Sequence, residues 1–200
     1  MLYTAQSGFR KHYSTSTALI KTIDKWNVEI DNENYFGAVF IDLSKAFDMV
    51  NHKLLIQKLC SLGISGAESS LFKSYLQNRT QCVLVNGKIS KPNTITSGVP
   101  QGSILGPLLF LFFINDMPSY LNNSIIDMYA DDTLIYVCNK EVSTIKNLLN
   151  DDLIALSKLL TDNEMKANVK KTKVMLLGTP IKTSRVSNIM VSMNGRMIEK

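Results

Sequence analysis

The 200-residue chain is 45% hydrophobic and 20% charged, with a net charge of +5, which is the composition of a globular protein with a substantial core. Three widely spaced cysteines without a Cys-x-x-Cys pair, and only two histidines, argue against a disulfide framework and against a zinc site. The N-terminus is too polar for a signal peptide, and the longest apolar run, 104–114, is too short to span a bilayer. We therefore expect an intracellular protein, nuclear and/or cytoplasmic, without a membrane partner.

Helices and strands are predicted to alternate irregularly, with frequent hairpins and no internal repeat. In the first half, the predicted elements are a helix over 14–30, a strand over 36–42, helices over 45–62 and 67–77, a strand over 81–85 and a turn at Asn86-Gly87. In the second half, they are a loop over 97–103, a helix over 103–121, a strand–turn–strand over 125–137, a helix over 142–160, a strand over 174–177 and a turn at Asn194-Gly195. This order predicts the α+β class.

Basic residues gather towards the C-terminal end of the chain, between Glu164 and Lys200. Clustered positive charge suits a polyanion partner such as nucleic acid. A solvated lysine face explains such a cluster almost as often, so the charge alone does not identify the partner.

Two adjacent acids, Asp131 and Asp132, lie between two apolar runs. The pattern predicts a strand, a tight turn and a second strand, with both acids at the turn. Neighbouring carboxylates repel unless cations compensate them, and a pair of divalent metals would do so in a site that favours phosphoryl chemistry. Asp-Asp turns are also common without any metal, so the pair alone leaves both interpretations open.

A third acid, Asp42, ends the apolar run 36–41. The run does not alternate, which predicts a strand buried on both faces, and Asp42 is the first charge after it. A helix cap is an equally good explanation of this acid alone. Together, however, Asp42, Asp131 and Asp132 form the minimal ligand set for two Mg²⁺ ions, whose other positions water and substrate phosphate would fill.

The loop Gly98-Val99-Pro100-Gln101-Gly102-Ser103 opens a predicted helix. Glycines permit close backbone approach, and the first turn of a helix offers N–H groups to anions. The loop lacks the Gly-x-x-x-x-Gly-Lys-Ser/Thr pattern, so an ordinary turn and helix start is the stronger interpretation of the loop by itself.

In order and spacing, these pieces closely resemble the reverse transcriptase domain of non-LTR retrotransposons of the LINE or jockey-like kind. The resemblance runs from Gln6 to about Gly178, and the order of its blocks is highly specific. The blocks are Gln-Ser-Gly-Phe-Arg (6–10), Val-Phe-Ile-Asp-Leu-Ser-Lys-Ala-Phe-Asp (39–48), Ser-Tyr-Leu-Gln-Asn-Arg (74–79), Ser-Gly-Val-Pro-Gln-Gly-Ser-Ile-Leu-Gly-Pro (97–107), Ile-Asn-Asp-Met (114–117), Tyr-Ala-Asp-Asp (129–132) and Asn-Val-Lys-Lys-Thr-Lys (168–173).

The resemblance implies a right-hand polymerase fold. Residues 1–178 would supply part of the fingers and the palm, which is a ferredoxin-like antiparallel sheet with packed helices. Residues 179–200 would form the palm edge leading towards a thumb. The family's upstream Arg-Pro-Ile-Ser fingers segment, its thumb and its endonuclease have no counterpart in these 200 residues, so they are expected in the remainder of a retrotransposon polyprotein.

The resemblance also implies roles for individual residues in the metal site. Asp42 and Asp131 would hold two Mg²⁺ ions, for which Mn²⁺ can substitute, while Asp132 would be a weaker ligand. The backbone carbonyl of Leu43 would complete one coordination sphere. One metal would lower the pKa of the primer 3′-hydroxyl, and the other would neutralise the triphosphate and the leaving pyrophosphate.

Further residues match positions that bind substrate or nucleic acid in the family. Phe47 matches a steric gate that excludes the 2′-hydroxyl, although a core phenylalanine is the competing interpretation. Gln101 and Gly102 match a loop against the template base and the incoming nucleotide. Lys171 matches a lysine near the triphosphate, although solvated charge is nearly as good an explanation. Arg10 is expected to contact a template phosphate.

The implied function is RNA-directed DNA polymerase, with dNTPs, an RNA template and a DNA primer as partners. The alternative is a catalytically inactive retrotransposon remnant that binds nucleic acid weakly, since segments that grip the primer and template are missing from the resemblance. A polymerase that copies RNA into RNA is a third possibility. Phe47 argues against it, because a bulky gate disfavours ribonucleotides.

Overall fold

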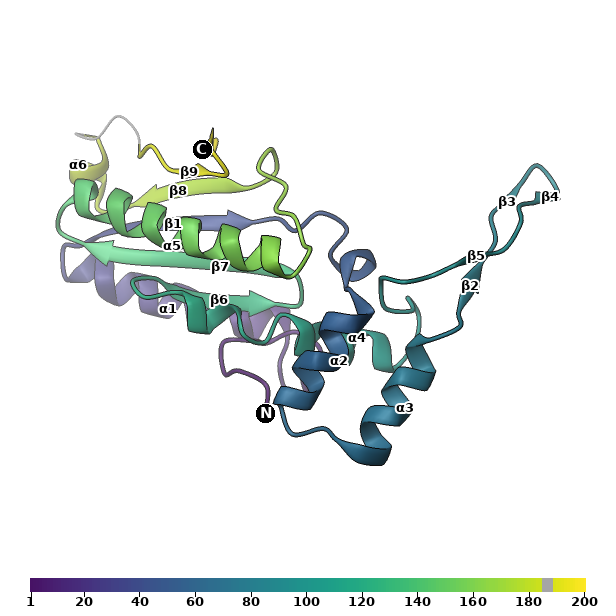
Figure 1. The fold of residues 1–200 in the computed structure, drawn as a ribbon. Helices are drawn as coiled ribbons and strands as arrows, with labels where there is room; N and C mark the ends of the chain where they lie inside the picture. Colours follow the sequence, from purple (N-terminus) through teal and green to yellow (C-terminus); the bar gives the residue numbers. More distant parts are fainter. Residues whose placement is uncertain (185–188) are drawn as a thin grey trace. The chain divides into compact units, whose positions relative to one another are not determined.

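The computed structural model describes residues 1–184 and 189–200, and the chain divides into two compact units (Figure 1). One unit contains Met1 and residues 45–114, and the other contains residues 2–44 and 115–200. The second unit, which we call the sheet unit, holds the largest sheet of the described residues.

Four antiparallel strands form the sheet of the sheet unit, in the order β6-β7-β1-β8. Their bounds are β1 (Tyr35–Ile41), β6 (Ile125–Tyr129), β7 (Asp132–Asn139) and β8 (Lys173–Leu177). The order places the first and third of these strands at the centre, as in a ferredoxin-like β-α-β-β-α-β sheet. The α+β class predicted from the sequence is confirmed.

Two long helices, α1 (Thr15–Asp31) and α5 (Val142–Asp162), cover opposite faces of this sheet (Figure 1). On the α1 face, the ring of Trp26 lies 4.5 Å from that of Phe36, which stacks at 4.8 Å on Tyr136. On the α5 face, a Cβ added to Gly37 would lie 2.3 Å from a methyl carbon of Ile145, so the absence of a side chain lets α5 approach β1. Both predicted helices are present. The period of α5 is confirmed by its buried apolar face, whereas on α1 Leu19 and Ile23 are 60% and 41% exposed.

The C-terminal residues of the chain belong to the sheet unit. They form the short helix α6 (Pro180–Thr183) and a small hairpin of β9 (Ser192–Met193) and β10 (Arg196–Met197). Asn194 and Gly195 both have positive φ between these strands, which confirms the predicted turn. The predicted boundary at residue 178 stays a prediction.

The other unit consists of helices and short hairpins. Its elements are η1 (Ala46–Met49), α2 (His52–Ser61), α3 (Gly66–Leu76), β2 (Thr80–Gln81), β3 (Leu84–Val85), β4 (Lys88–Ile89), β5 (Asn93–Thr94) and α4 (Leu105–Phe113). β2 pairs with β5 and β3 with β4, around a turn at Asn86-Gly87 where both residues have positive φ. The predicted hairpin turn is therefore confirmed, but the single strand 81–85 is wrong because two short strands replace it.

Two of the predicted helices are wrong in length. The helix predicted over 45–62 divides into η1 and α2, because the side chain of Asn51 accepts hydrogen bonds from the backbone N–H groups of Lys53 and Leu54 and so begins a new helix. The helix predicted over 103–121 ends at Phe113, and a separate 3₁₀ turn, η2 (Met117–Tyr120), carries Pro118 in its first turn. Of the helices in the described residues, none has the length and apolar character needed to cross a membrane.

Candidate active site

The β6–β7 turn carries the first of the predicted metal ligands. Tyr129 pairs with Asp132, so the turn consists of Ala130 and Asp131, and Ala130 has a φ of 56°. Asp132 is already the first residue of β7. The prediction that both acids lie at the turn is therefore wrong for Asp132, because the tight two-residue loop leaves it in the strand ladder.

Asp42 directly follows β1, the strand that pairs with β7. Ile41 is opposite Thr133, and the next step of this antiparallel register places Asp42 opposite Asp132. Partial burial raises the pKa of Asp132, and the neighbouring carboxylates of Asp131 and Asp42 raise it further. The structure thus brings the three predicted acids together at one end of the sheet.

The backbone around Asp42 is held by a segment that lies far away in the sequence. The Asp42 carbonyl accepts from the Asn168 N–H at 2.8 Å, and the Ser44 N–H donates to the Lys166 carbonyl at 2.8 Å. Leu43, between them, forms a bridge with Ala167, and neither hydrogen bond uses the Leu43 carbonyl. The carbonyl that the resemblance names as a metal ligand therefore lies directly beside Asp42, in backbone fixed on both sides.

A groove of about 550 Å³ opens between α1 and the sheet. Two of the acids, Asp42 and Asp132, line it together with Lys171, which lies on an exposed turn after Asn168. Apolar side chains of α1 and β1, among them Trp26 and Phe40, line the remainder. Phe40 is 41% exposed because it faces this groove, so the prediction that β1 is buried on both faces is wrong at this residue.

The acids suit a divalent cation in their chemistry. In residues 1–184 and 189–200, no three His, Cys, Asp or Glu side chains converge into a ready-made metal cage. Mg²⁺ is ordinarily held by one or two carboxylates, with waters and substrate phosphates supplying the other ligands. Asp132, with the charges of Asp131 and Asp42 near it and a backbone carbonyl beside Asp42, offers oxygen ligands of this kind, so the residues present fit the metal.

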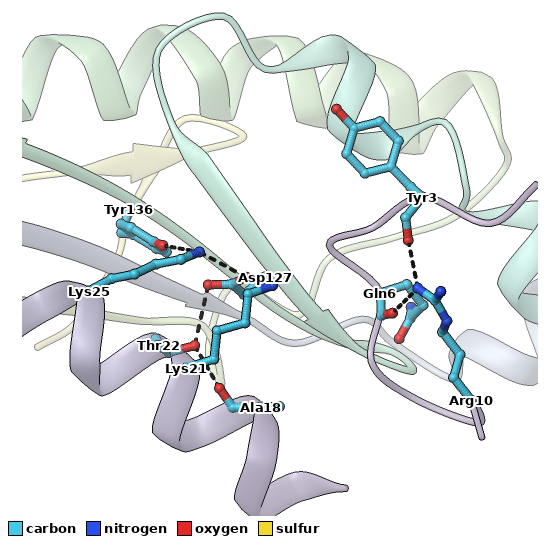
Figure 2. Close-up of polar contacts among 9 residues, drawn as sticks. All are labelled: Tyr3, Gln6, Arg10, Ala18, Lys21, Thr22, Lys25, Asp127 and Tyr136. Atoms are coloured by element: carbon cyan, nitrogen blue, oxygen red, sulfur yellow. Dashed lines mark hydrogen bonds and ion pairs between the residues drawn. The ribbon is translucent and has the colours of Figure 1, made fainter. Parts of the chain in front are cut away.

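A polar cluster joins α1 to β6, as Figure 2 shows. Its residues Lys21, Thr22 and Asp127 also line the groove. Asp127 on β6 accepts a hydrogen bond from the Thr22 hydroxyl at 3.3 Å and pairs with the ammonium groups of Lys21 and Lys25 at 3.9 and 3.7 Å. Lys25 also donates to the Tyr136 hydroxyl at 3.2 Å. We did not predict this cluster from the sequence, although an acid interrupting the apolar run 125–129 is a signal for it.

The remaining predicted substrate residues belong to the other unit. The ring of Phe47 stacks on that of Phe110, with centroids 4.3 Å apart, and it is half-buried. The loop that carries Gln101 and Gly102 is tied to the Phe47 segment, since the Val99 N–H donates to the Phe47 carbonyl and the Gln101 side chain donates to Asp48 at 2.9 Å. Phe47 and Gln101 are thus held in one framework, whereas their roles and their relation to the three acids stay predictions.

Arg10 has an intramolecular role in the sheet unit. Its Nη1 donates to the backbone carbonyls of Tyr3 at 3.2 Å and Gln6 at 2.9 Å, as drawn in Figure 2. Its guanidinium also lies 4.7 Å from the centre of the Tyr13 ring. These contacts hold the N-terminal segment, and the expected phosphate contact stays a prediction.

The chain is similar to known proteins over most of its length. A family model described as reverse transcriptase (RNA-dependent DNA polymerase) matches residues 2–192. The chain is 30% identical over 200 residues to the RNA-directed DNA polymerase from mobile element jockey of Drosophila melanogaster. It is 37% identical over 142 residues to the probable RNA-directed DNA polymerase from transposon BS of the same species.

These relatives are much longer than the chain. The jockey alignment covers 96% of this chain and 21% of the relative, and the BS alignment covers 67% and 16%. Among solved structures, telomerase from Candida albicans in complex with a TWJ fragment of telomeric RNA superposes with a TM-score of 0.64 at 15% identity, over 96% of this chain and 34% of that one. The polymerase fold expected from the sequence is confirmed.

Proposed function

This chain belongs to the reverse transcriptase (RNA-dependent DNA polymerase) family, and we propose that it adds deoxynucleotides to a primer 3′-hydroxyl in the order set by an RNA template. The observation that supports this most strongly is the convergence of Asp42, Asp131 and Asp132 at one end of the sheet, beside a groove that also receives Lys171. The partners would be an RNA template, a DNA primer, dNTPs and the remainder of a retrotransposon polyprotein, in the nucleus or cytoplasm.

Reverse transcriptases are generally divalent-metal enzymes, and we propose that two Mg²⁺ ions, or Mn²⁺ in their place, bind here. Asp42 and Asp131 would hold both ions, Asp132 would contribute weakly, and the Leu43 carbonyl would complete one coordination sphere. Such ions lower the pKa of a bound hydroxyl and neutralise triphosphate charge.

The protein's own residues would orient the substrates around that site. Lys171, exposed at the groove, would donate a proton to the leaving pyrophosphate. Phe47 would exclude a 2′-hydroxyl by its bulk, and its stack on Phe110 supports this by holding the ring in one orientation. Gln101 and Gly102 would pack against the template base and the incoming nucleotide, and Arg10 would contact a template phosphate.

The test is primer extension on poly(rA)/oligo(dT) with dTTP and Mg²⁺, comparing the chain with its Asp131→Asn variant. We expect extension that requires the template and disappears in the variant, because the variant keeps the size of the side chain but loses the ligand charge. Extension that survives in Asp131→Asn would contradict the proposed site.

The inactive remnant predicts a different result. It predicts no extension by wild-type protein whose circular dichroism shows a folded chain, together with weak binding of a fluorescent template–primer. Incorporation of ribonucleotides in preference to deoxynucleotides would instead favour a polymerase that copies RNA into RNA.

A further inference from the structure

The N-terminal segment lies along the free edge of β6, the strand that leads to the catalytic turn. The Ser7 N–H donates to the Met128 carbonyl at 2.8 Å, and the Met128 N–H donates to the Ala5 carbonyl at 2.9 Å. Gln6 forms a parallel bridge with Met128. The segment therefore pairs with β6 two residues before the turn that carries Asp131.

The Gln6 side chain reaches from this segment to the turn itself. It is 2% exposed, and its Oε1 accepts from the Ala130 N–H at 2.9 Å and from the Gly8 N–H at 2.7 Å. Its Nε2 donates to the Ala130 carbonyl at 3.2 Å. One side chain thus satisfies both backbone polar groups of Ala130, and the two N–H donors determine which end of the amide is oxygen.

Ala130 needs such support because its backbone is strained. Its φ of 56° lies in the left-handed region, which costs a residue with a Cβ about 1 kcal/mol. Ala130 immediately precedes Asp131, so its dihedral angles determine where the carboxylate of Asp131 points. A turn held in one conformation would keep that carboxylate in one place.

Two neighbours of Gln6 complete the contact. A Cβ added to Gly8 would lie 2.2 Å from the Ala130 nitrogen, so only glycine lets the segment approach the turn this closely. Arg10 donates to the Gln6 carbonyl at 2.9 Å, as Figure 2 shows, and holds the backbone of the segment in place. Gln6, Gly8 and Arg10 therefore form one connected support, which we call the turn brace.

We propose that Gln6 is a positioning residue for Asp131 and that it acts through the turn brace. This proposal rests on the proposed function, because only the proposed function gives Asp131 a metal ion to bind. Outer-shell partners that orient a metal ligand ordinarily change metal affinity by about 10- to 100-fold when they are removed. Gln6 differs from such partners in holding the backbone of Ala130, the residue before the ligand, instead of the carboxylate of the ligand.

The experiment compares wild type with Gln6→Met, which keeps the length of the side chain and removes the amide. Amide hydrogen exchange by NMR reports on Ala130, and electron paramagnetic resonance of free Mn²⁺ reports on metal affinity without any need for activity. We expect the Ala130 amide to exchange faster and Mn²⁺ affinity to fall by about tenfold. Gly8→Ala should shift both readouts in the same direction.

Asn150→Ala serves as the control for general destabilisation. Asn150 lies on α5 and accepts a hydrogen bond from the Ser192 N–H at 2.9 Å, so its loss loosens the sheet unit away from the turn. We expect wild-type Mn²⁺ affinity and wild-type exchange at Ala130 in this variant. A loss of affinity as large as that in Gln6→Met would overturn the proposal, because it would then reflect stability alone.

Unchanged Mn²⁺ affinity in Gln6→Met would also overturn the proposal, whether or not the Ala130 amide exchanges faster. Failure of the wild type to bind Mn²⁺ is a distinguishable result. It would contradict the metal site of the proposed function, while faster Ala130 exchange in Gln6→Met would still support the turn brace.

Discussion

Three carboxylates at one end of a sheet repel one another unless a cation lies among them. The repulsion affects Asp132, because partial burial and the charges of Asp131 and Asp42 raise its pKa. Such mutual repulsion lowers stability and is retained where function requires the charge. At the scale of single residues, stability without metal therefore tests the site independently of activity.

The first prediction concerns Asp132→Asn. A carboxyl group whose pKa is raised by folding destabilises the protein above that pKa, and the penalty disappears as the pH falls through it. In EDTA at pH 7 we expect the variant to be more stable than wild type, by less than about 1 kcal/mol because the site is partly exposed. Urea denaturation should show this difference vanishing at acid pH. A variant less stable than wild type at pH 7 would contradict the clustering of the three carboxylates. The control is Asp151→Asn, which replaces an exposed acid on α5.

The second prediction concerns Phe47→Ala. Removing the ring should let the enzyme incorporate ribonucleotides, because nothing would then oppose the 2′-hydroxyl. The measurement is the ratio of dTTP to UTP incorporation on the same template–primer. Phe110→Leu removes the ring that holds Phe47 in one orientation but keeps Phe47 itself, so it should weaken sugar discrimination less than Phe47→Ala does. Equal discrimination by wild type and Phe47→Ala would show that Phe47 is only a packing residue.

At the scale of elements, the loop that enters β6 depends on one buried acid. Asp152 on α5 is 1% exposed, and its carboxylate accepts from the backbone N–H groups of Asn122, Asn123 and Ser124 at 2.6–3.1 Å. It also accepts from the Asn123 side chain at 3.1 Å. These bonds connect the helix on one face of the sheet to the start of the β6–β7 hairpin.

The third prediction is that Asp152→Ala destabilises the protein by about 2 kcal/mol, because three backbone N–H groups of a partly exposed loop lose their buried, charged acceptor. Asp151→Ala, at the exposed neighbouring position, should change stability by less than about 0.5 kcal/mol. Urea denaturation with an unchanged m-value measures both. Similar small effects for the two variants would contradict the structural role of Asp152.

The sequence predicted elements wherever a local pattern determined them. The helices over 14–30 and 142–160 followed from period, and the turns at 86–87 and 194–195 followed from Asn-Gly. The break at Asn51 was missed because a cap competes with helix propensity, and sequence alone does not show which prevails.

The candidate site was predictable only in part. The acids Asp42, Asp131 and Asp132 could be recognised because charges end or interrupt apolar runs. The role of Gln6 depends on residues 124 positions away, and no local pattern contains such a contact. The Asp127 cluster was missed for the same reason, since its partners come from a helix about a hundred residues earlier.

At the scale of the whole molecule, charge and length determine how the activity should be measured. The chain has a net charge of +5 and a pI near 9.0, so association with nucleic acid should weaken steeply as salt rises. It spans about a fifth of the jockey relative, and the activity of that whole protein is extended to this chain only as a proposal. Assays at low salt and high template–primer concentration therefore test the chemistry separately from the binding.

The most direct test of the account is the rate of single-nucleotide extension by Asp42→Asn, Asp131→Asn and Asp132→Asn under those conditions. We expect the first two to lose at least about 1,000-fold in rate and Asp132→Asn to lose less, since Asp132 is the weaker proposed ligand. Each variant should remain folded, because removing one of three repelling charges relieves the sheet unit. Near-wild-type extension by Asp42→Asn or Asp131→Asn would contradict the assignment of this end of the sheet as the catalytic centre.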